Sequence, residues 1–185
     1  TVKYGTKIKN NKDIQENKNR IEEILRDINM QMSTYISDSE ISRFNTTKNI
    51  EWMDISEDFA FVVKSSFKYY KISDGLYDIT VMPLVNLWGF GPENRPEIVP
   101  SREALSATKA RIGLKYLSLQ GNKLTKAIPE LYVDLSTIAK GYGVDVVTEL
   151  IENNGIENYL VEIGGEMRLK GFKASGELWH VAIEK

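Results

Sequence analysis

The stretch V-D-L-S-T-I-A-K-G-Y-G-V-D, residues 133–145, decides how this chain is expected to fold. Apolar residues around Asp134 predict a strand over residues 131–135, and Ser136 is followed by a run with helical periodicity that reaches Asn153. The first N–H groups of a helix lack intrahelical partners and carry partial positive charge, so they favour phosphate oxygens. The pattern therefore predicts a strand that leads into a helix, with a nucleotide-binding turn between them.

Two interpretations of Asp134 and Lys140 stay open on spacing alone. Asp134 either contacts a ligand or only caps the helix, and Lys140, one helical turn beyond Ser136, either neutralises phosphate or is solvated. In the first interpretation the backbone carbonyl of Thr137 faces a hard cation such as Mg²⁺, which prefers oxygen ligands. The glycine spacing of a P-loop or of a dinucleotide fingerprint is missing here, so both motifs are excluded.

Several other positions suggest ligand contacts, and each has an ordinary alternative. Gly164-Gly165 follows a predicted strand and either lets the backbone pass close to a ligand or forms a hairpin turn. Tyr35 lies in a polar segment, where it either stacks on an aromatic ring or simply packs. Asp78 is either a turn residue or a ligand contact. His180, the only histidine, is interpreted as an ordinary strand residue, because no Ser or Asp neighbour suggests a catalytic triad.

The rest of the chain alternates helical and strand-like segments. Helices are expected over residues 12–32, from Ser56 to Ser73, from Ser101 to Gly113, and over residues 137–153. Strands are expected over residues 1–9, 77–82, 116–119, 123–127, 131–135, 159–163, 167–171 and 178–183, with loops at 32–45 and 83–96. The prediction is an α+β fold, a single domain over residues 1–185 in which three to four helices pack on a mixed or antiparallel sheet.

The composition narrows the class of protein. With 185 residues, 42% of them hydrophobic and 27% charged, the chain has an ordinary globular composition. Its net charge of −2 gives no general attraction to nucleic acid, so no nucleic-acid partner is expected. The absence of cysteine excludes disulfides, thiolate zinc sites and a cysteine nucleophile. Because the chain begins and ends in predicted strands, we expect it to be a piece of a larger protein.

Four motifs occur in order along nearly the whole chain. They are M-S-T-Y-I-S-D-S-E-I-S-R-F-N at 32–45, Y-D-I-T-V-M-P-L-V-N-L-W-G-F-G-P at 77–92, D-L-S-T-I-A-K-G-Y-G-V-D at 134–145 and Y-L-V-E-I-G-G-E at 159–166. Together they resemble the FAD:protein FMN transferases, the ApbE-like family. The resemblance implies an ApbE-like fold that lacks the family's C-terminal part, and a partial flavin transferase domain over residues 1–185.

The resemblance also implies an activity and a set of site residues. Enzymes of this family cleave FAD at its pyrophosphate in a Mg²⁺-dependent reaction, attach the FMN moiety to a threonine of an acceptor flavoprotein and release AMP. The acceptor supplies the hydroxyl, so no catalytic nucleophile is assigned in this chain. By motif position, FAD contacts are implied for Tyr35, Leu76, Tyr77, Asp78, Asp134 and Lys140, and a backbone carbonyl ligand to magnesium for Thr137.

Two alternatives to flavin transfer remain at this point. The same scaffold would act as an FAD pyrophosphatase that yields FMN and AMP if water replaced the threonine, or as a module that binds FAD without chemistry. The resemblance further implies a lipoprotein that is exported, periplasmic or membrane-anchored, with a lipid signal that lies outside this sequence. The resemblance places the acidic and threonine ligands to magnesium, and further FAD contacts, in the missing C-terminal part.

Overall fold

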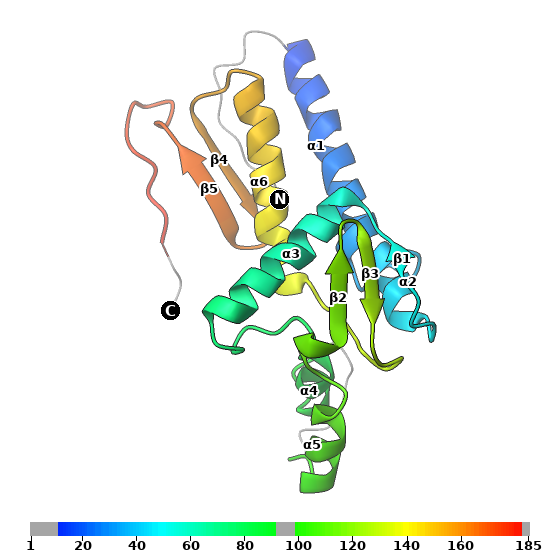
Figure 1. The fold of residues 1–185 in the computed structure, drawn as a ribbon. Helices are drawn as coiled ribbons and strands as arrows, with labels where there is room; N and C mark the ends of the chain where they lie inside the picture. The colour runs from blue at the N-terminus through cyan, green and yellow to red at the C-terminus, as the bar shows by residue number, and fades with distance from the viewer. Residues whose placement is uncertain (1–10, 92–98, 183–185) are drawn as a thin grey trace. The chain divides into compact units, whose positions relative to one another are not determined.

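The computed structural model describes residues 11–91 and 99–182 (Figure 1). The chain divides into two compact units: residues 1–28 with 139–185 form unit 1, and residues 29–138 form unit 2. In chain order the elements are α1 (Asn11–Met32), α2 (Glu40–Thr46), β1 (Met53–Asp54), α3 (Glu57–Ile72), α4 (Met82–Leu87), α5 (Arg102–Lys109), the short 3₁₀ helix η1 (Leu114–Tyr116), β2 (Leu117–Gln120), β3 (Lys123–Lys126), α6 (Ser136–Asn153), β4 (Tyr159–Ile163) and β5 (Glu166–Lys170). The strand predicted over residues 1–9 lies outside the described residues.

Unit 1 packs two helices and a β-hairpin around one apolar core (Figure 1). The core contains one residue of α1, three of α6 and two of β4. They are Ile21, then Val144, Val147 and Ile151, and then Tyr159 and Val161. Gly143 of α6 lies beside this core, and a Cβ there would make ordinary van der Waals contacts, 3.4 Å from Ile163 and 3.7 Å from Ile28.

The β4–β5 hairpin closes through a two-residue glycine turn. β4 and β5 pair antiparallel up to Ile163 and Glu166. Between them, Gly164 and Gly165 have φ values of +58° and +97°. Two consecutive positive φ values are the requirement of a type I′ turn, which glycine meets without steric cost. Of the two interpretations of this glycine pair, the hairpin turn is confirmed.

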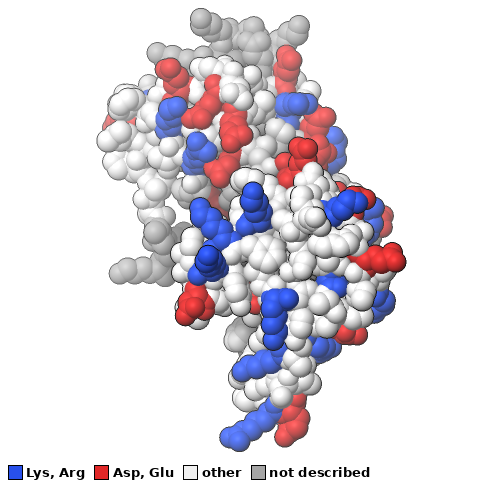
Figure 2. All heavy atoms as spheres, in the orientation of Figure 1, with Lys and Arg blue, Asp and Glu red and all other residues white. Residues whose placement is uncertain are grey.

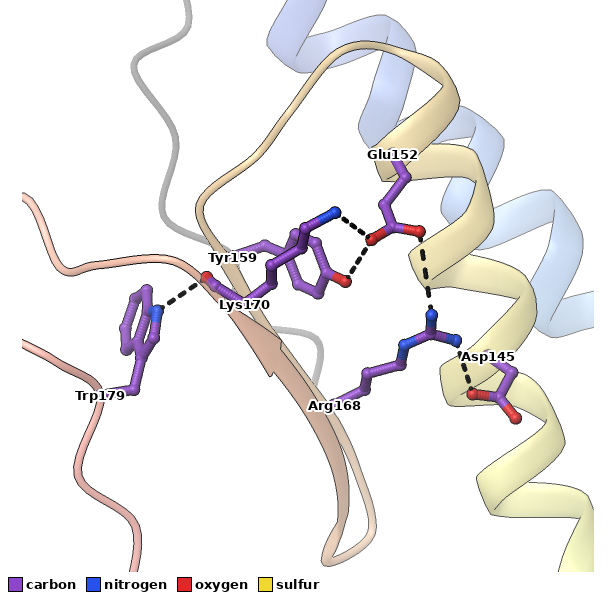
Figure 3. Close-up of polar contacts among 6 residues, drawn as sticks. All are labelled: Asp145, Glu152, Tyr159, Arg168, Lys170 and Trp179. Carbon is purple, nitrogen blue, oxygen red and sulfur yellow. Dashed lines mark hydrogen bonds and ion pairs between the residues drawn. The ribbon is translucent and has the colours of Figure 1, made fainter.

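A polar network ties the hairpin to α6 (Figure 3). The Glu152 carboxylate of α6 accepts hydrogen bonds from the Tyr159 hydroxyl at 2.8 Å and from Lys170 Nζ at 3.0 Å. Arg168 of β5 donates to Asp145 at 3.0 Å and lies 3.8 Å from Glu152. The hydrogen bond from Lys170, and after it the bond from Tyr159, lower the pKa of Glu152. Burial, and after it the bond to Glu152, raise the pKa of Tyr159.

Unit 2 is built on a three-stranded antiparallel sheet in the order β1-β3-β2. β2 and β3, which correspond to the strands predicted over residues 116–119 and 123–127, form a hairpin around Gly121, whose φ is +56°. α3 packs against β2 and begins at Ser56, whose side chain accepts a hydrogen bond from the Phe59 N–H, as its sequence position predicts. The buried apolar side chains of unit 2 include Ile41, Phe44, Phe59, Val62, Val63, Leu124, Leu131, Val133 and Leu135.

The outer face of α3 is basic. Figure 2, in the orientation of Figure 1, shows Lys and Arg side chains gathered over this part of unit 2. Lys64, Lys68 and Lys71 are spaced four and three residues apart along the helix and are exposed. This spacing places them on one face of a helix. We interpret this face as the solvated side of an amphipathic helix.

Two strands predicted in unit 2 are wrong. Residues 77–82 form a turn that enters α4, because Asp78 Oδ1 accepts hydrogen bonds from both the N–H and the hydroxyl of Thr80, and Pro83 favours a helix start. Residues 131–135 are extended and buried but are not part of a sheet. Their partner is a side chain, as described below.

Other boundaries shift for local reasons. The segment expected as a loop at 32–45 contains α2, which Ser39 caps by accepting from the Ser42 N–H at 3.1 Å. The helix that begins after Ser101 ends at Lys109 rather than at Gly113. The strand predicted over residues 178–183 is also wrong in its described part: a single bridge joins Phe172 to Leu178, and residues 179–182 are not strand, so His180 is not a strand residue.

The predicted fold class is confirmed. The described residues combine helices with antiparallel sheets, and the four predicted helices are present as α1, α3, α5 and α6. Two short helices, α2 and α4, were not predicted. The strands form two separate antiparallel sheets, one in each unit.

Candidate functional site

A cavity of about 400 Å³ lies in unit 2. It is lined by the start of the segment that follows α1, by α4, by the end of α5 with the residues just after it, and by the segment that leads into α6. The polar and aromatic side chains in its lining include Tyr35, Asn86, Arg111, Tyr132, Asp134 and Ser136. Two predicted site residues, Tyr35 and Asp134, therefore line the same cavity although ninety-nine positions separate them in the sequence.

Asp134 both caps α6 and faces this cavity. Its side chain is buried, with 8% of the residue exposed, and its Oδ1 accepts a hydrogen bond from the Ser136 N–H at 2.8 Å. Its backbone N–H donates to the Ile79 carbonyl at 2.8 Å. The described residues give Oδ2 no hydrogen-bond donor. One carboxylate oxygen is thus used in the cap, and the other remains available to a ligand.

Asp78 is held in a turn next to this segment. The Thr80 hydroxyl donates to Asp78 Oδ1 at 2.7 Å and accepts from the Gly113 N–H at 2.7 Å. Asp78 precedes Ile79, whose carbonyl pairs with Asp134. The sequence interpretation of Asp78 as a turn residue is confirmed. Its contact with FAD stays a prediction.

Tyr77 and Thr137 also lie together. The Thr137 hydroxyl donates to the Tyr77 hydroxyl at 3.2 Å, and the Tyr77 ring lies edge to face with Tyr69 at 6.0 Å between centroids. These contacts bring the start of α6 and the turn after α3 into one place. In contrast, Leu76 is 92% exposed and Tyr35 82% exposed. Both side chains present apolar surface to solvent, where an aromatic ligand would find it.

Lys140 belongs to unit 1. It lies in α6, one turn after Thr137, and its side chain is exposed. Its aliphatic part runs beside Gly164, where a Cβ would lie 3.1 Å from Lys140 Cδ. Among the described residues the Lys140 ammonium has neither a hydrogen bond nor an ion pair. The amino group is therefore available for an anion, as the prediction requires.

Sequence reasoning missed most of the cavity lining, including Arg111, the acidic Glu130 and Tyr132. Arg111 is exposed at the end of α5 and adds a positive charge to the cavity, and within the described part of the chain its guanidinium has no ion-pair partner. Tyr132 lies two positions before Asp134 on the same extended segment. An alternating strand pattern places Tyr132 and Asp134 on one side, which is a signal that could have identified the tyrosine. No sequence pattern indicates Arg111.

The described residues contain no cluster of side chains that could hold a metal ion. Across residues 11–91 and 99–182, no three His, Cys, Asp or Glu side chains lie together as a metal site would need. The only predicted ligand here is the Thr137 carbonyl, in the first turn of α6. The residues present therefore do not fit a complete Mg²⁺ shell of oxygen ligands by themselves.

No helix in the described segments combines the length and the apolar character that a membrane crossing requires.

Comparison with known proteins gives consistent matches. The sequence profile of the ApbE family matches residues 2–185. The FAD:protein FMN transferase of Vibrio cholerae serotype O1 is 54% identical over 165 residues, which are 89% of this chain and 49% of that protein. The FAD:protein FMN transferase of Escherichia coli K12 is 44% identical over 158 residues, or 83% of this chain and 45% of that protein. The chain thus spans about half the length of these curated relatives.

This chain covers a larger share of two solved structures than of the curated relatives. The flavin transferase ApbE from Vibrio cholerae superposes on 100% of this chain and 63% of its own length, with a TM-score of 0.89 and 47% identity. The flavinyl transferase ApbE from Pseudomonas stutzeri, in its apo form, matches 99% of this chain and 65% of its own, with a TM-score of 0.85 and 35% identity. Both similarities extend over the two units described above.

Proposed function

Because this chain belongs to the ApbE family, we propose that the protein transfers the FMN moiety of FAD to a threonine hydroxyl of an acceptor flavoprotein. In this reaction the P–O bond between the FMN phosphorus and the oxygen bridging to the AMP phosphate breaks, and a bond forms between the FMN phosphorus and the threonine oxygen. AMP leaves with the electron pair of the broken bond, and the proton of the threonine hydroxyl is released to water or to the AMP phosphate. The observation that carries the proposal is the 54% identity to a relative named FAD:protein FMN transferase.

The cavity of unit 2 supports FAD binding. It contains aromatic side chains that can stack on a flavin or adenine ring, and Arg111 offers a positive charge to a phosphate. Asp134 carries a carboxylate oxygen, Oδ2, that has no donor among the described residues. A carboxylate repels phosphate, so Asp134 suits a hydroxyl or N–H donor of FAD rather than the diphosphate. Tyr35, Leu76, Tyr77 and Asp78 remain proposed FAD contacts.

Positive charge near the diphosphate would come from two sources. The exposed ammonium of Lys140 would neutralise phosphate, since group transfer at phosphorus depends on positioning and on charge neutralisation. Mg²⁺ would supply further charge, with the Thr137 carbonyl as one ligand. The described residues do not complete its shell, so the other ligands would be phosphate oxygens, water or residues outside the described ranges. We assign the metal no step here.

The acceptor would bring the nucleophile. No side chain of this chain is assigned as a nucleophile, which agrees with a reaction whose attacking hydroxyl belongs to another protein.

We further propose an exported or membrane-anchored location, with a lipid anchor on a segment outside this sequence.

A labelling experiment tests the proposal. The protein is incubated with FAD, Mg²⁺ and an acceptor flavoprotein, as this chain and as a version extended at its C-terminus. Flavin fluorescence that stays on the acceptor in a denaturing gel supports transfer. Free FMN and AMP without a labelled acceptor would indicate a pyrophosphatase instead, and unchanged FAD a binding module. Asp134→Asn is expected to reduce labelling, whereas Asp54→Asn, an exposed carboxylate of the same unit paired with Lys123, serves as the control.

A further inference from the structure

The extended segment 131–135 is held by a side chain in place of a neighbouring strand. Asn45, in the last turn of α2, donates from Nδ2 to the Val133 carbonyl at 2.8 Å, and its Oδ1 accepts from the Val133 N–H at 2.8 Å. These two bonds reproduce the pair that one residue of an antiparallel strand exchanges with its partner. They explain why a segment with the pattern of a buried strand belongs to no sheet.

The next residue is fixed from the opposite edge. Successive residues of an extended chain point their backbone groups to alternate edges, so Val133 faces Asn45 and Asp134 faces Ile79. The Asp134 N–H donates to the Ile79 carbonyl at 2.8 Å. Held on both edges, the segment turns the Asp134 carboxylate toward Ser136 and the cavity.

Asn45 is itself anchored by a buried lysine. Lys126 of β3 is 1% exposed, and its ammonium donates to the Phe44 carbonyl at 2.9 Å and to the Asn45 carbonyl at 3.3 Å. It also lies 5.2 Å from the centre of the Phe44 ring. A buried ammonium that gives up water needs such acceptors, so it holds the end of α2 in place. The hydrogen-bonded path therefore runs from β3 through the end of α2 to the residue before Asp134.

We propose that Asn45 is a positioning residue for the nucleotide site: by clamping Val133 it sets the orientation of the Asp134 carboxylate that receives FAD. The inference rests on the proposed function for its ligand. It goes beyond that function because Asn45 is not part of the cavity lining, and its side chain hydrogen-bonds Val133 rather than Asp134. Its effect on binding passes entirely through the backbone of residues 133–134.

A purely structural role makes a different prediction. If Asn45 only satisfies buried backbone groups, its loss lowers stability and leaves the geometry of Asp134 in the folded protein unchanged. If it positions Asp134, its loss acts on the same binding interaction as a change at Asp134. The two roles are separated by a double-mutant cycle, which measures whether two changes act independently.

The cycle uses Asn45→Ala, Asp134→Asn and the double variant. FAD affinity is measured by titration under conditions where each protein is fully folded by circular dichroism. We expect Asn45→Ala to weaken FAD binding about tenfold and the double variant to bind no more weakly than Asp134→Asn alone. Asn45→Asp keeps the acceptor for the Val133 N–H but loses the donor, and it should behave like Asn45→Ala.

Two controls separate positioning from lost stability. Val63→Ala removes part of the core of unit 2 far along the sequence from the clamp and should leave FAD affinity unchanged once the protein is folded. Asn49→Ala removes an exposed asparagine of the same unit whose amide bonds Glu51. The proposal fails if Asn45→Ala binds FAD as tightly as the wild type, or if its effect multiplies with that of Asp134→Asn.

A readout without FAD keeps the inference independent of the proposed function. Hydrogen exchange at the Ser136 amide reports the cap that Asp134 makes, and it should become faster in Asn45→Ala relative to the Leu124 amide of β3. An unchanged ratio would overturn the positioning role even if FAD binds. If the wild type binds no FAD but the ratio rises, the clamp positions Asp134 and the flavin function is the part that is wrong.

Discussion

Replacement of Gly164 by alanine should damage both the β4–β5 turn and the environment of Lys140. Gly164 has a φ of +58°, in the left-handed region, where an L-residue costs about 1–2 kcal/mol. A Cβ at this position would also lie 3.1 Å from Lys140 Cδ and 3.3 Å from Cε. Because a lysine side chain is flexible, it will move aside at little energetic cost and carry its ammonium to a new position.

The two effects have different magnitudes and different readouts. The backbone strain should lower the free energy of unfolding by about 1–2 kcal/mol, which for a chain of this size corresponds to about 2–8 °C in melting temperature. The displacement of Lys140 should weaken FAD binding by about tenfold or less, since complete loss of a charged hydrogen bond costs about 1.5–3 kcal/mol and the amine is only moved. Lys140→Ala should therefore bind FAD more weakly than Gly164→Ala.

Gly155→Ala is a matched control. Gly155 has a φ of +72° in the same unit, and no atom lies within 4 Å of the Cβ that alanine would add. It should suffer a similar loss of stability and keep wild-type FAD affinity. Thermal unfolding and FAD titration of the two variants decide the matter. Equal FAD affinity in both, at equal stability, would falsify the assignment of Lys140 as a phosphate contact.

Three further predictions concern other parts of the chain. Lys126→Met should lower the free energy of unfolding by about 1–3 kcal/mol in urea titrations, because the carbonyls at the end of α2 lose their donor. Burial also lowers the pKa of Lys126, so just below pH 10.5 the unfolded wild type binds more protons than the folded protein. The stability of the wild type should therefore rise with pH in this range, and that of the variant should not. The pKa of Glu152 is lowered in the folded state, so its contribution to stability is present above about pH 4.5 and is lost as the pH falls through the folded pKa. Glu152→Gln should therefore reduce the fall of the urea midpoint at acidic pH. The same fall in variant and wild type would contradict the network of Figure 3. Arg111→Gln should weaken FAD binding about tenfold, whereas Arg102→Gln, at the exposed start of α5, should not.

Local sequence rules predicted the elements whose partners are near in sequence. Ser56 and Ser101 cap their helices as expected, because capping needs only the next three residues. The two hairpins follow from glycines between short strands. The strand predicted over residues 131–135 failed for the opposite reason, because its backbone partner is a side chain from eighty-eight positions earlier. No periodicity carries that information.

The same distinction applies to the site. The start of α6 was predicted because Asp134 and Ser136 are adjacent to a helical run, and the cap between them is present. Arg111 was not predicted, because it reaches the cavity only through the way α4 and α5 pack on each other. Sequence reasoning therefore identified Tyr35 and Asp134 of the cavity lining but not Arg111.

The two interpretations of Asp134, helix cap and ligand contact, support each other rather than compete. A free carboxylate can rotate, and a ligand that binds it must order it. With Oδ1 held by the Ser136 N–H and the backbone held on both edges by Asn45 and Ile79, little rotation remains for Oδ2 to lose. Preorganisation of this kind lowers the entropic cost of binding. The cap is thus a reason to expect a ligand on the second oxygen, and a cap made by Asn in Asp134→Asn should preserve the helix while it weakens FAD binding.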